Sequence, residues 1–508
     1  MIDSLVGVIV ALCAAVAILD SSSRRRGVAM VAAVILAPAL IAGDQWHATQ
    51  VAELRNSPIL LAAALLVAGA MVAALATLFT RWPLLMPVLI LVALPFRVPL
   101  DVGGEEANLL MPLYLVMAGG VAASAWQQWV RPEDGITARP ERVAPTGLAV
   151  WLKPLLAASV VLFALGLFWS EDRSTGLQNL CFFLVPFSVI FALMVDVEWT
   201  SKRLRTVLVV IVGMALVCSL IAFAEHQFRF LLWNETVIRT NDFNVYFRVN
   251  SLFWDPNVFG RYLALAITMV AATLIWSRKR NEAIVLCVIA AVLWLALVIT
   301  FSQSSFIALL AGLAVLVALR WSLRFVLIGT GLLAVATILF ATVAGGVVKL
   351  DLSRLNAQSA GRANLIEGGI NLFENRPIFG YGPGSFSEAF REEETNGNAP
   401  VTESHTEPIT VAAEQGIVGL AVYVALIVTA IAALSAGMRA VMPGLGAAPG
   451  ARDLTRGPPA SRAAVLAAFI AVLVHTITYA GFLDDPITWV LIAIGYSLAF
   501  PCRATSAA

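Results

Sequence analysis

Apolar runs of about 15 to 22 residues recur along the whole chain, separated by polar segments. An α-helix of this length crosses the roughly 30 Å hydrocarbon core of a bilayer and satisfies its own backbone hydrogen bonds. The pattern therefore predicts up to fifteen spans, of which the first, seventh and last are short enough to be partial or re-entrant. They are 5–19, 27–43, 58–79, 82–100, 109–126, 149–169, 180–195, 207–224, 257–276, 283–300, 304–319, 325–344, 416–437, 463–482 and 486–500.

The amino-acid composition also indicates a membrane protein. The chain has 508 residues, of which 60% are hydrophobic and 13% are charged, whereas soluble proteins carry about 25% charged residues. We therefore expect an all-α integral membrane protein with about 12–15 transmembrane helices and a long helical extracytoplasmic loop. The first apolar run has its arginines, Arg24 to Arg26, behind it rather than before it, which argues against a secretory signal.

Loop charge predicts the orientation of these helices. Arginine and lysine gather in every second loop, as in Arg24–Arg26, Lys202–Arg205 and Arg278–Arg280, and such loops face the cytoplasm. This places the N-terminus and the long polar segment 345–415 outside. We expect a multi-pass protein of the cytoplasmic membrane with four parts. They are N-terminal spans 1–224, spans with a basic, aromatic outer loop 225–344 (loop 225–256), an extracytoplasmic catalytic loop 345–415, and C-terminal spans 416–508.

Two outer loops, 225–256 and 345–415, carry basic residues on an otherwise acidic outer side. The planar guanidinium group matches two phosphate oxygens at once, so these arginines predict an anionic ligand. The candidates are Arg248, Arg261, Arg362 and, in a supporting role, Arg376. Arg261 lies inside the start of a span, where a charge needs a partner or a cavity. For each of them, snorkelling or a surface ion pair is the alternative.

His405 is the only histidine in the long loop, and Glu403 and Glu407 lie beside it. A neutral imidazole can take a proton from an incoming hydroxyl group, so His405 is the candidate catalytic base. A solvated or structural histidine is the alternative. His475 lies within a span, where a hydrogen bond to a neighbouring helix is the simpler interpretation.

The turn Gly380–Gly384 (GYGPG) resembles a phosphate-binding loop only superficially, because it follows a helical pattern and Pro383 lacks an N–H donor. We interpret it as a rigid turn that directs a helix over Ser385–Glu394. The preceding helical pattern ends at Pro377 and has an apolar side. The five cysteines are scattered and form no cluster with histidine, so we expect no metal and no cofactor.

Together these segments resemble the bacterial O-antigen ligases and O-antigen polymerases. The resemblance rests on R-A-N-L from Arg362, P-I-F-G-Y-G-P-G-S-F from Pro377, S-H-T-E-P from Ser404 and E-Q-G-I-V-G-L from Glu414. The segment from Arg248 to Leu263 is similar to an upstream element of that family, an arginine followed by a P-N pair that includes Asn257. The resemblance covers about residues 240 to 420. Leu365 and Gln303 depart from the residues usual in the family.

The resemblance implies a metal-independent glycosyltransferase that acts outside the cytoplasm with inversion. Its donor would be a glycan on a polyprenyl diphosphate, and its acceptor a glycan or lipid hydroxyl group. Arginines matching Arg248 and Arg362 would hold the diphosphate, and a histidine matching His405 would activate the acceptor. Ligase and polymerase share this chemistry and both remain open, and no nucleic acid partner is expected. A transporter or flippase of lipid-linked glycans is the alternative function, although it would favour internal repeats and more charged spans.

Overall fold

The computed structural model describes residues 1–46, 56–102, 105–129, 142–243, 246–330, 362–394, 404, 406–446 and 459–502. Within these residues the chain is helical, apart from one β-hairpin. Eleven helical segments among them are long and apolar enough to cross a membrane. The predicted class, an all-α membrane protein, is thereby confirmed, with eleven candidate spans in the described residues where about 12–15 were predicted for the chain.

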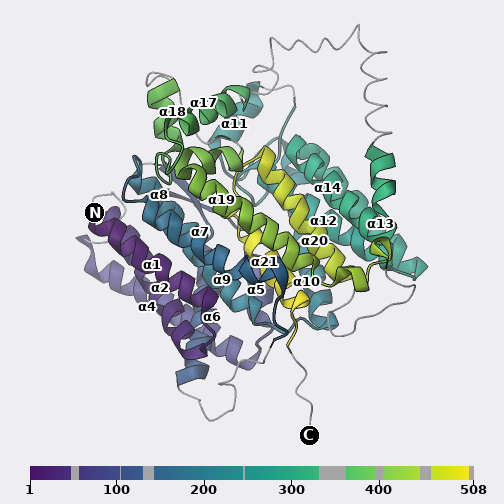
Figure 1. Cartoon of the computed structure of the whole chain (residues 1–508), viewed down its shortest axis with the longest axis horizontal. Coiled ribbons are helices and arrows are strands. Elements are labelled where there is room, and N and C mark those ends of the chain that lie inside the picture. Colours follow the sequence, from purple (N-terminus) through teal and green to yellow (C-terminus); the bar gives the residue numbers. More distant parts are fainter. Residues whose placement is uncertain are drawn as a thin grey trace.

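The main helices run nearly side by side, as Figure 1 shows, and α11, α17 and α18 lie together at one end, here called the upper end. The last described residues, which follow α21, lie toward the lower end. The helices are α1 (Ile2–Leu19), α2 (Ser23–Asp44), α4 (Pro58–Arg81), α5 (Leu85–Ala93), α6 (Met111–Trp129), α7 (Leu152–Gly166), α8 (Arg173–Asn179), α9 (Val185–Val195), α10 (Ser201–Phe228), α11 (Glu235–Phe243), α12 (Pro256–Trp276), α13 (Arg280–Thr300), α14 (Gln303–Arg320), α17 (Arg362–Asn375), α18 (Phe386–Glu394), α19 (Glu407–Ser435), α20 (Pro459–Thr478) and α21 (Pro486–Ala499).

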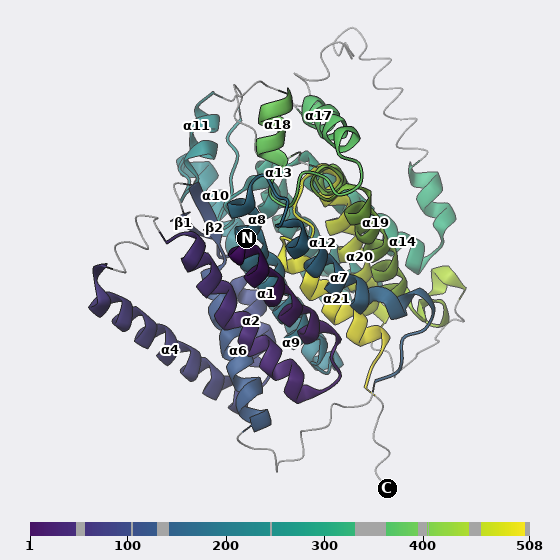
Figure 2. The ribbon, with the colours of Figure 1, turned by 60° about the vertical axis from the view of Figure 1, so that its left-hand side comes forward.

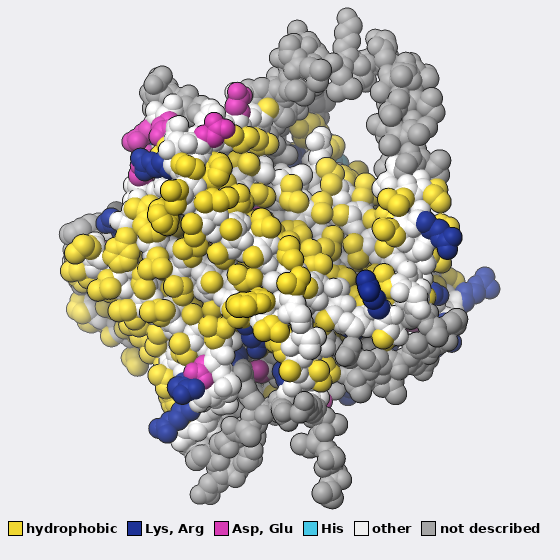
Figure 3. Space-filling view, in the orientation of Figure 1, with side chains coloured by type: hydrophobic (Ala, Val, Ile, Leu, Met, Phe, Trp, Pro, Cys, Tyr) yellow, Lys and Arg dark blue, Asp and Glu magenta, His cyan; other side chains and the backbone are white. Residues whose placement is uncertain are grey.

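Helix α12 forms the centre of one half of the molecule. It is buried over most of its length and packs against α10, α13, α14 and α20. Gly260 permits one of these contacts, because a Cβ there would lie 2.5 Å from the Ser305 hydroxyl of α14. The face of the molecule seen in Figure 3 is a broad hydrophobic band with charged side chains mainly at its margins. Such a band is what the hydrocarbon core of a bilayer requires.

The predicted span 82–100 is wrong as a single helix. Helix α5 has only nine residues, and an antiparallel hairpin follows, made of β1 (Val98–Val102) and β2 (Glu105–Leu109). Pro95 explains the early end, because it has no N–H to continue the helical hydrogen bonds, although Leu94 before it still has helical backbone angles. This segment is therefore a broken span whose second part is extended.

The upper end carries a small helical unit with its own core. Helices α17 and α18 lie above the body in Figures 1 and 2 and pack against each other and against α19. Their shared core contains Leu372, Tyr381, Phe386, Phe390 and Ala413. The predicted helix over Ser385–Glu394 is confirmed as α18, which begins one residue later.

Candidate functional site

The glycine-rich turn between α17 and α18 is wedged between two distant segments. Gly380, Gly382 and Gly384 all have positive φ angles, of 66°, 93° and 80°. A Cβ on Gly382 would lie 2.3 Å from the Cα of Ser170, and one on Gly380 would lie 2.4 Å from the Glu414 backbone. Only glycine fits both the backbone conformation and the space. The interpretation of this motif as a rigid turn is confirmed.

Backbone hydrogen bonds fasten this turn to α19. The amide of Tyr381 donates to the carbonyl of Ala413 (3.0 Å), and the amide of Gly382 donates to that of Glu414 (2.8 Å). At Gly416 the helix is kinked, with φ 63° and ψ −161°, and the next amide donates to the Pro377 carbonyl (2.8 Å). The first turns of α19 thus belong to the upper helical unit, and the remainder, from residue 417, continues toward the lower end.

Ser385 ties the same turn to the segment before α8. Its hydroxyl lies 3.0 Å from that of Ser170 and accepts hydrogen bonds from the amides of Glu171 (3.0 Å) and Asp172 (3.1 Å). Beside it, the exposed Arg376 pairs with Glu171 at 2.7 Å and covers the ring of Tyr381, 4.0 Å from its centroid. The contacts of Arg376 are therefore those of a residue that braces the upper helical unit.

Arg248 is held in a fixed position at the upper ends of α12 and α13. Its Nε donates to the Thr300 carbonyl at the end of α13 (3.0 Å), and its Nη2 donates to Oδ1 of Asn257 in α12 (3.0 Å). The Asn241 side chain bonds both the amide and the carbonyl of Arg248, each at 2.9 Å. The guanidinium group is therefore oriented by neutral partners, and no carboxylate among the described residues neutralises it.

Arg261 lies one turn below Asn257 on the same face of α12, since the two are four residues apart. It is 3% exposed, and its Nη2 lies 2.7 Å from Oδ2 of Asp485, which caps the start of α21. Its Nη1 donates to the Gly481 carbonyl (3.1 Å), whereas its Nε has no hydrogen-bond partner in the described part of the chain. Asp485 is therefore the partner that a charged residue inside a span was expected to need.

Glu407 joins this arrangement from the first residue of α19. Its carboxylate is buried and accepts a hydrogen bond from the Gly481 amide (2.7 Å), while the Gly481 carbonyl accepts from Arg261. One peptide turn thus bridges Glu407 to Arg261. We call Arg248, Asn257, Arg261, Asp485 and Glu407 the arginine site.

A buried cluster of hydroxyl groups supports the arginine site from below. The hydroxyl of Ser302 lies 3.1 Å from that of Ser304 and 2.7 Å from that of Ser305, which donates to the Asn257 carbonyl (3.3 Å). Nε2 of His475, in α20, lies 3.2 Å from the Ser304 hydroxyl. The expected helix-to-helix hydrogen bond of His475 is confirmed, and it fixes the beginning of α14.

Two predicted site residues lie outside the described residues: His405, the candidate base, and Glu403. Arg362 is the first residue of α17, but its side chain also lies outside the described part. The neighbours of His405 in sequence are described: the Ser404 hydroxyl bonds the Thr410 hydroxyl (2.7 Å), and Thr406 precedes α19. The roles of His405, Glu403 and Arg362 therefore stay predictions.

Sequence reasoning missed Asp485, Gly481 and the serine cluster as parts of this arrangement. A signal for Asp485 was present, because an arginine inside a span demands an acidic partner. Asp485-Pro486 also repeats the helix start of Asp255-Pro256, with an aspartate cap followed by proline in the first turn. Gly481 has no comparable signal in sequence, because it acts through its backbone, whereas the serines lie in the segment F-S-Q-S-S from Phe301, which resembles the O-antigen ligase family.

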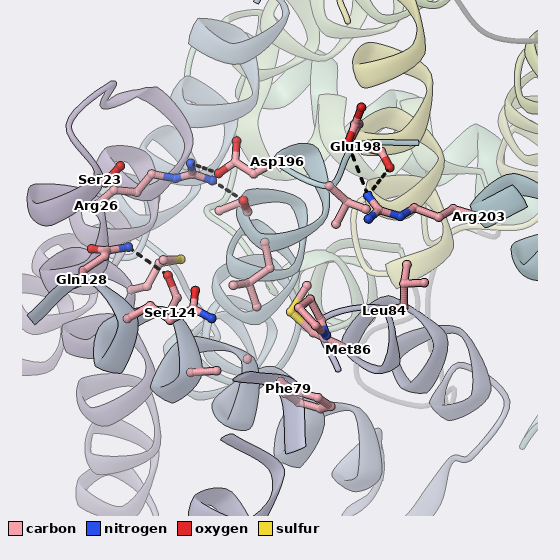
Figure 4. A pocket seen from close by; sticks show the side chains of 18 residues that line it. Ser23, Arg26, Phe79, Leu84, Met86, Ser124, Gln128, Asp196, Glu198 and Arg203 are labelled. Atoms are coloured by element: carbon pink, nitrogen blue, oxygen red, sulfur yellow. Dashed lines mark hydrogen bonds and ion pairs between the residues drawn. The ribbon is translucent and has the colours of Figure 1, made fainter. Parts of the chain in front are cut away.

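A cavity of about 390 Å³ lies in the lower half, between α2, α5, α6 and α9. Figure 4 shows its charged residues already joined to one another, Arg26 to Asp196 and Arg203 to Glu198. Arg26 is buried and also donates to the Ala17 carbonyl. This cavity is distinct from the arginine site, and its paired charges are those of a structural contact.

A comparison with protein families identifies the family that one part of the chain resembles. A model of the O-antigen ligase family matches residues 288–424, whereas no curated protein gives a significant match. The matched part includes Arg362, His405 and Glu407, while Arg248 and Arg261 precede it. The resemblance inferred from the motifs is confirmed, and a glycan-transfer activity is what this family implies. The protein is therefore a multi-span membrane protein whose residues 288–424 match the O-antigen ligase family.

Proposed function

We propose that the protein transfers a glycan from a polyprenyl diphosphate donor to an acceptor hydroxyl group at the outer face of the cytoplasmic membrane. The upper end of the molecule would then face outward. The observation that carries the proposal is the arginine site. Arg248 is bonded to Asn257 of α12, and Arg261 of the same helix is bridged through Gly481 to Glu407, the first residue of α19, which lies within the family-matched segment.

The arginine site suits a diphosphate leaving group. Guanidinium groups bind phosphate oxygens in pairs and remain charged at all physiological pH values. Arg248 is oriented by neutral partners, so its charge is available to a ligand. In this role arginines supply the charge stabilisation that a metal ion supplies in other phosphate chemistry. Arg362 would add a further guanidinium group from α17.

The chemical step is a single displacement at the anomeric carbon. His405 takes the proton of the acceptor hydroxyl as its oxygen attacks, and the bond between the anomeric carbon and the diphosphate oxygen breaks. The electron pair leaves with the polyprenyl diphosphate, and attack from the opposite face inverts the anomeric centre. Glu407, which follows His405 by two residues, is anchored to the Gly481 turn.

The decisive experiment is transfer by the His405→Ala variant, reconstituted in vesicles with a radiolabelled lipid-linked glycan and no ion gradient. We expect donor binding near that of the wild type and transfer reduced by at least about 100-fold, the usual contribution of a general base. His226→Ala, which removes another histidine near the upper end, should transfer normally. Unchanged transfer by His405→Ala would remove this residue from the mechanism. Glycan movement across the vesicle without transfer would instead favour a flippase.

A further inference from the structure

Arg97 lies in the second part of the predicted span 82–100, after the helix has ended. It stands between the end of α5 and the first residue of β1, outside any helix or strand. Non-helical backbone within a span is tolerated where protein surrounds it or where it lines a polar cavity. In membrane proteins that bind solutes, such discontinuous helices often mark the binding site. Arg97 therefore stands at the kind of position where a ligand-binding side chain is expected.

Arg97 makes no hydrogen bond and no ion pair within the described part of the chain, and its Nε is buried. Arginine is never deprotonated in proteins and carries five donors. A partly buried guanidinium group without a partner is costly, unless an anion from outside the protein completes it. By contrast, Arg26 and Arg261, the other buried arginines discussed above, each have a carboxylate.

The charged groups close enough to act on Arg97 belong to the arginine site and its rim. They are Asp485, Asp255 and Arg261, with the Tyr114 hydroxyl nearby. Both carboxylates are engaged elsewhere. Asp255 accepts from the amides of Asn257 (2.6 Å) and Val258 (3.1 Å) at the start of α12.

Asp485 likewise accepts from the Ile487 amide (2.9 Å) and contacts Arg261 at 2.7 Å. Neither aspartate is thus a hydrogen-bonded partner of Arg97. Arg97 therefore lies near a second arginine and near two carboxylates that already have other partners. In this position it can meet an anion that arrives at the arginine site.

We propose that Arg97 is a further donor-binding residue, which contributes a guanidinium group from the N-terminal half of the chain to the diphosphate bound at the arginine site. This inference rests on the proposed function and deepens it. It assigns a role to a residue outside the family-matched segment 288–424.

The test compares prenyl ligands that differ only in charge. Full-length protein in nanodiscs is titrated with farnesyl diphosphate and with farnesol. Relative to the wild type, Arg97→Gln should bind farnesyl diphosphate about ten- to a hundredfold more weakly, the loss expected for a charge-assisted contact, with farnesol affinity unchanged. Arg239→Gln, which removes an exposed arginine near the same end, should bind both ligands as the wild type does.

Two results would overturn the role of Arg97: wild-type affinity of Arg97→Gln for the diphosphate, or equal losses for diphosphate and farnesol, which indicate a structural defect. If Arg97→Gln does not fold, Arg97→Lys is used. It should bind the diphosphate at least about fivefold more weakly because the two-pronged contact is lost. Unchanged affinity would count against the proposal. A wild-type protein that binds no farnesyl diphosphate would instead refute the donor class, and with it the proposed function.

Discussion

Arg261 has two roles in this arrangement: it forms a buried ion pair with Asp485, and it is a candidate donor-binding residue. Both side chains are almost completely buried, with 3% and 2% of their surface exposed. Breaking a buried pair by removing one charge leaves the other without compensation, which typically costs about 3–5 kcal/mol. A stability defect in an Arg261 variant would therefore say nothing by itself about donor binding.

A double substitution separates the two roles. We expect Arg261→Met to lower the free energy of unfolding by about 3–5 kcal/mol, because Asp485 loses its counter-charge. Adding Asp485→Asn should restore most of this stability, since asparagine still caps α21. Donor affinity should stay low in the double variant, because the guanidinium group is absent. Thermal unfolding and donor titration measure the two quantities, and wild-type donor affinity of the double variant would make Arg261 a structural residue only.

Sequence reasoning reached the arginines of this site but not their surroundings. Arg248 and Arg261 stand out because basic residues are rare on an acidic side and costly inside a span. Their partners Thr300 and Gly481 act through backbone carbonyls, which every residue possesses. Arg97 escaped notice for a different reason. It lay within a run whose hydrophobicity predicted a continuous helix, although Pro95 and Pro99 flank it.

At the scale of elements, the glycine-rich turn connects three parts of the chain that are far apart in sequence. A Cβ at Gly382 would collide with the segment before α8. A Cβ at Gly416, at the kink of α19, would collide with the backbone just before the turn. The turn itself could be predicted, because glycine and proline interrupt the helical pattern. The segment it docks against could not, since Ser170 and Glu171 carry no local sign of that contact.

Gly382→Ala tests this connection. The added Cβ would meet the Ser170 backbone at 2.3 Å, and the φ of 93° is unfavourable for alanine, so we expect a loss of more than about 1 kcal/mol. The upper helical unit should detach before the spans unfold, and limited proteolysis should cut near α17 and α18 earlier than in the wild type. Glycan transfer should fall along with it.

Gly213→Ala is the matched control, because a Cβ there meets nothing within 4 Å and lies within a regular helix. Equal protease resistance of Gly382→Ala and the wild type would show that the turn tolerates a side chain. The docking account of the motif would then be wrong.

At the scale of the whole molecule, the bilayer makes most of the helices predictable, because only helices of a defined length satisfy the backbone in hydrocarbon. Counting apolar residues fails where a span is divided. Hydropathy does not distinguish a nine-residue α5 followed by a hairpin from a full helix. The same counting cannot show which helices gather around α12, because lipid tails and neighbouring helices are equally apolar to each side chain.

The proposed function requires that the upper end face outward, and loop charge predicts this orientation. In a chain whose five cysteines are replaced, we introduce Glu392→Cys, exposed on α18, or Lys279→Cys, exposed before α13. A membrane-impermeant maleimide should label the first variant in intact spheroplasts and the second only after permeabilisation, because the sequence predicts three spans between the two positions, 283–300, 304–319 and 325–344. Retained glycan transfer verifies the fold of each variant, and the cysteine-free chain sets the background. The reverse labelling pattern would place the arginine site on the cytoplasmic side, where a donor delivered to the outer leaflet cannot reach it.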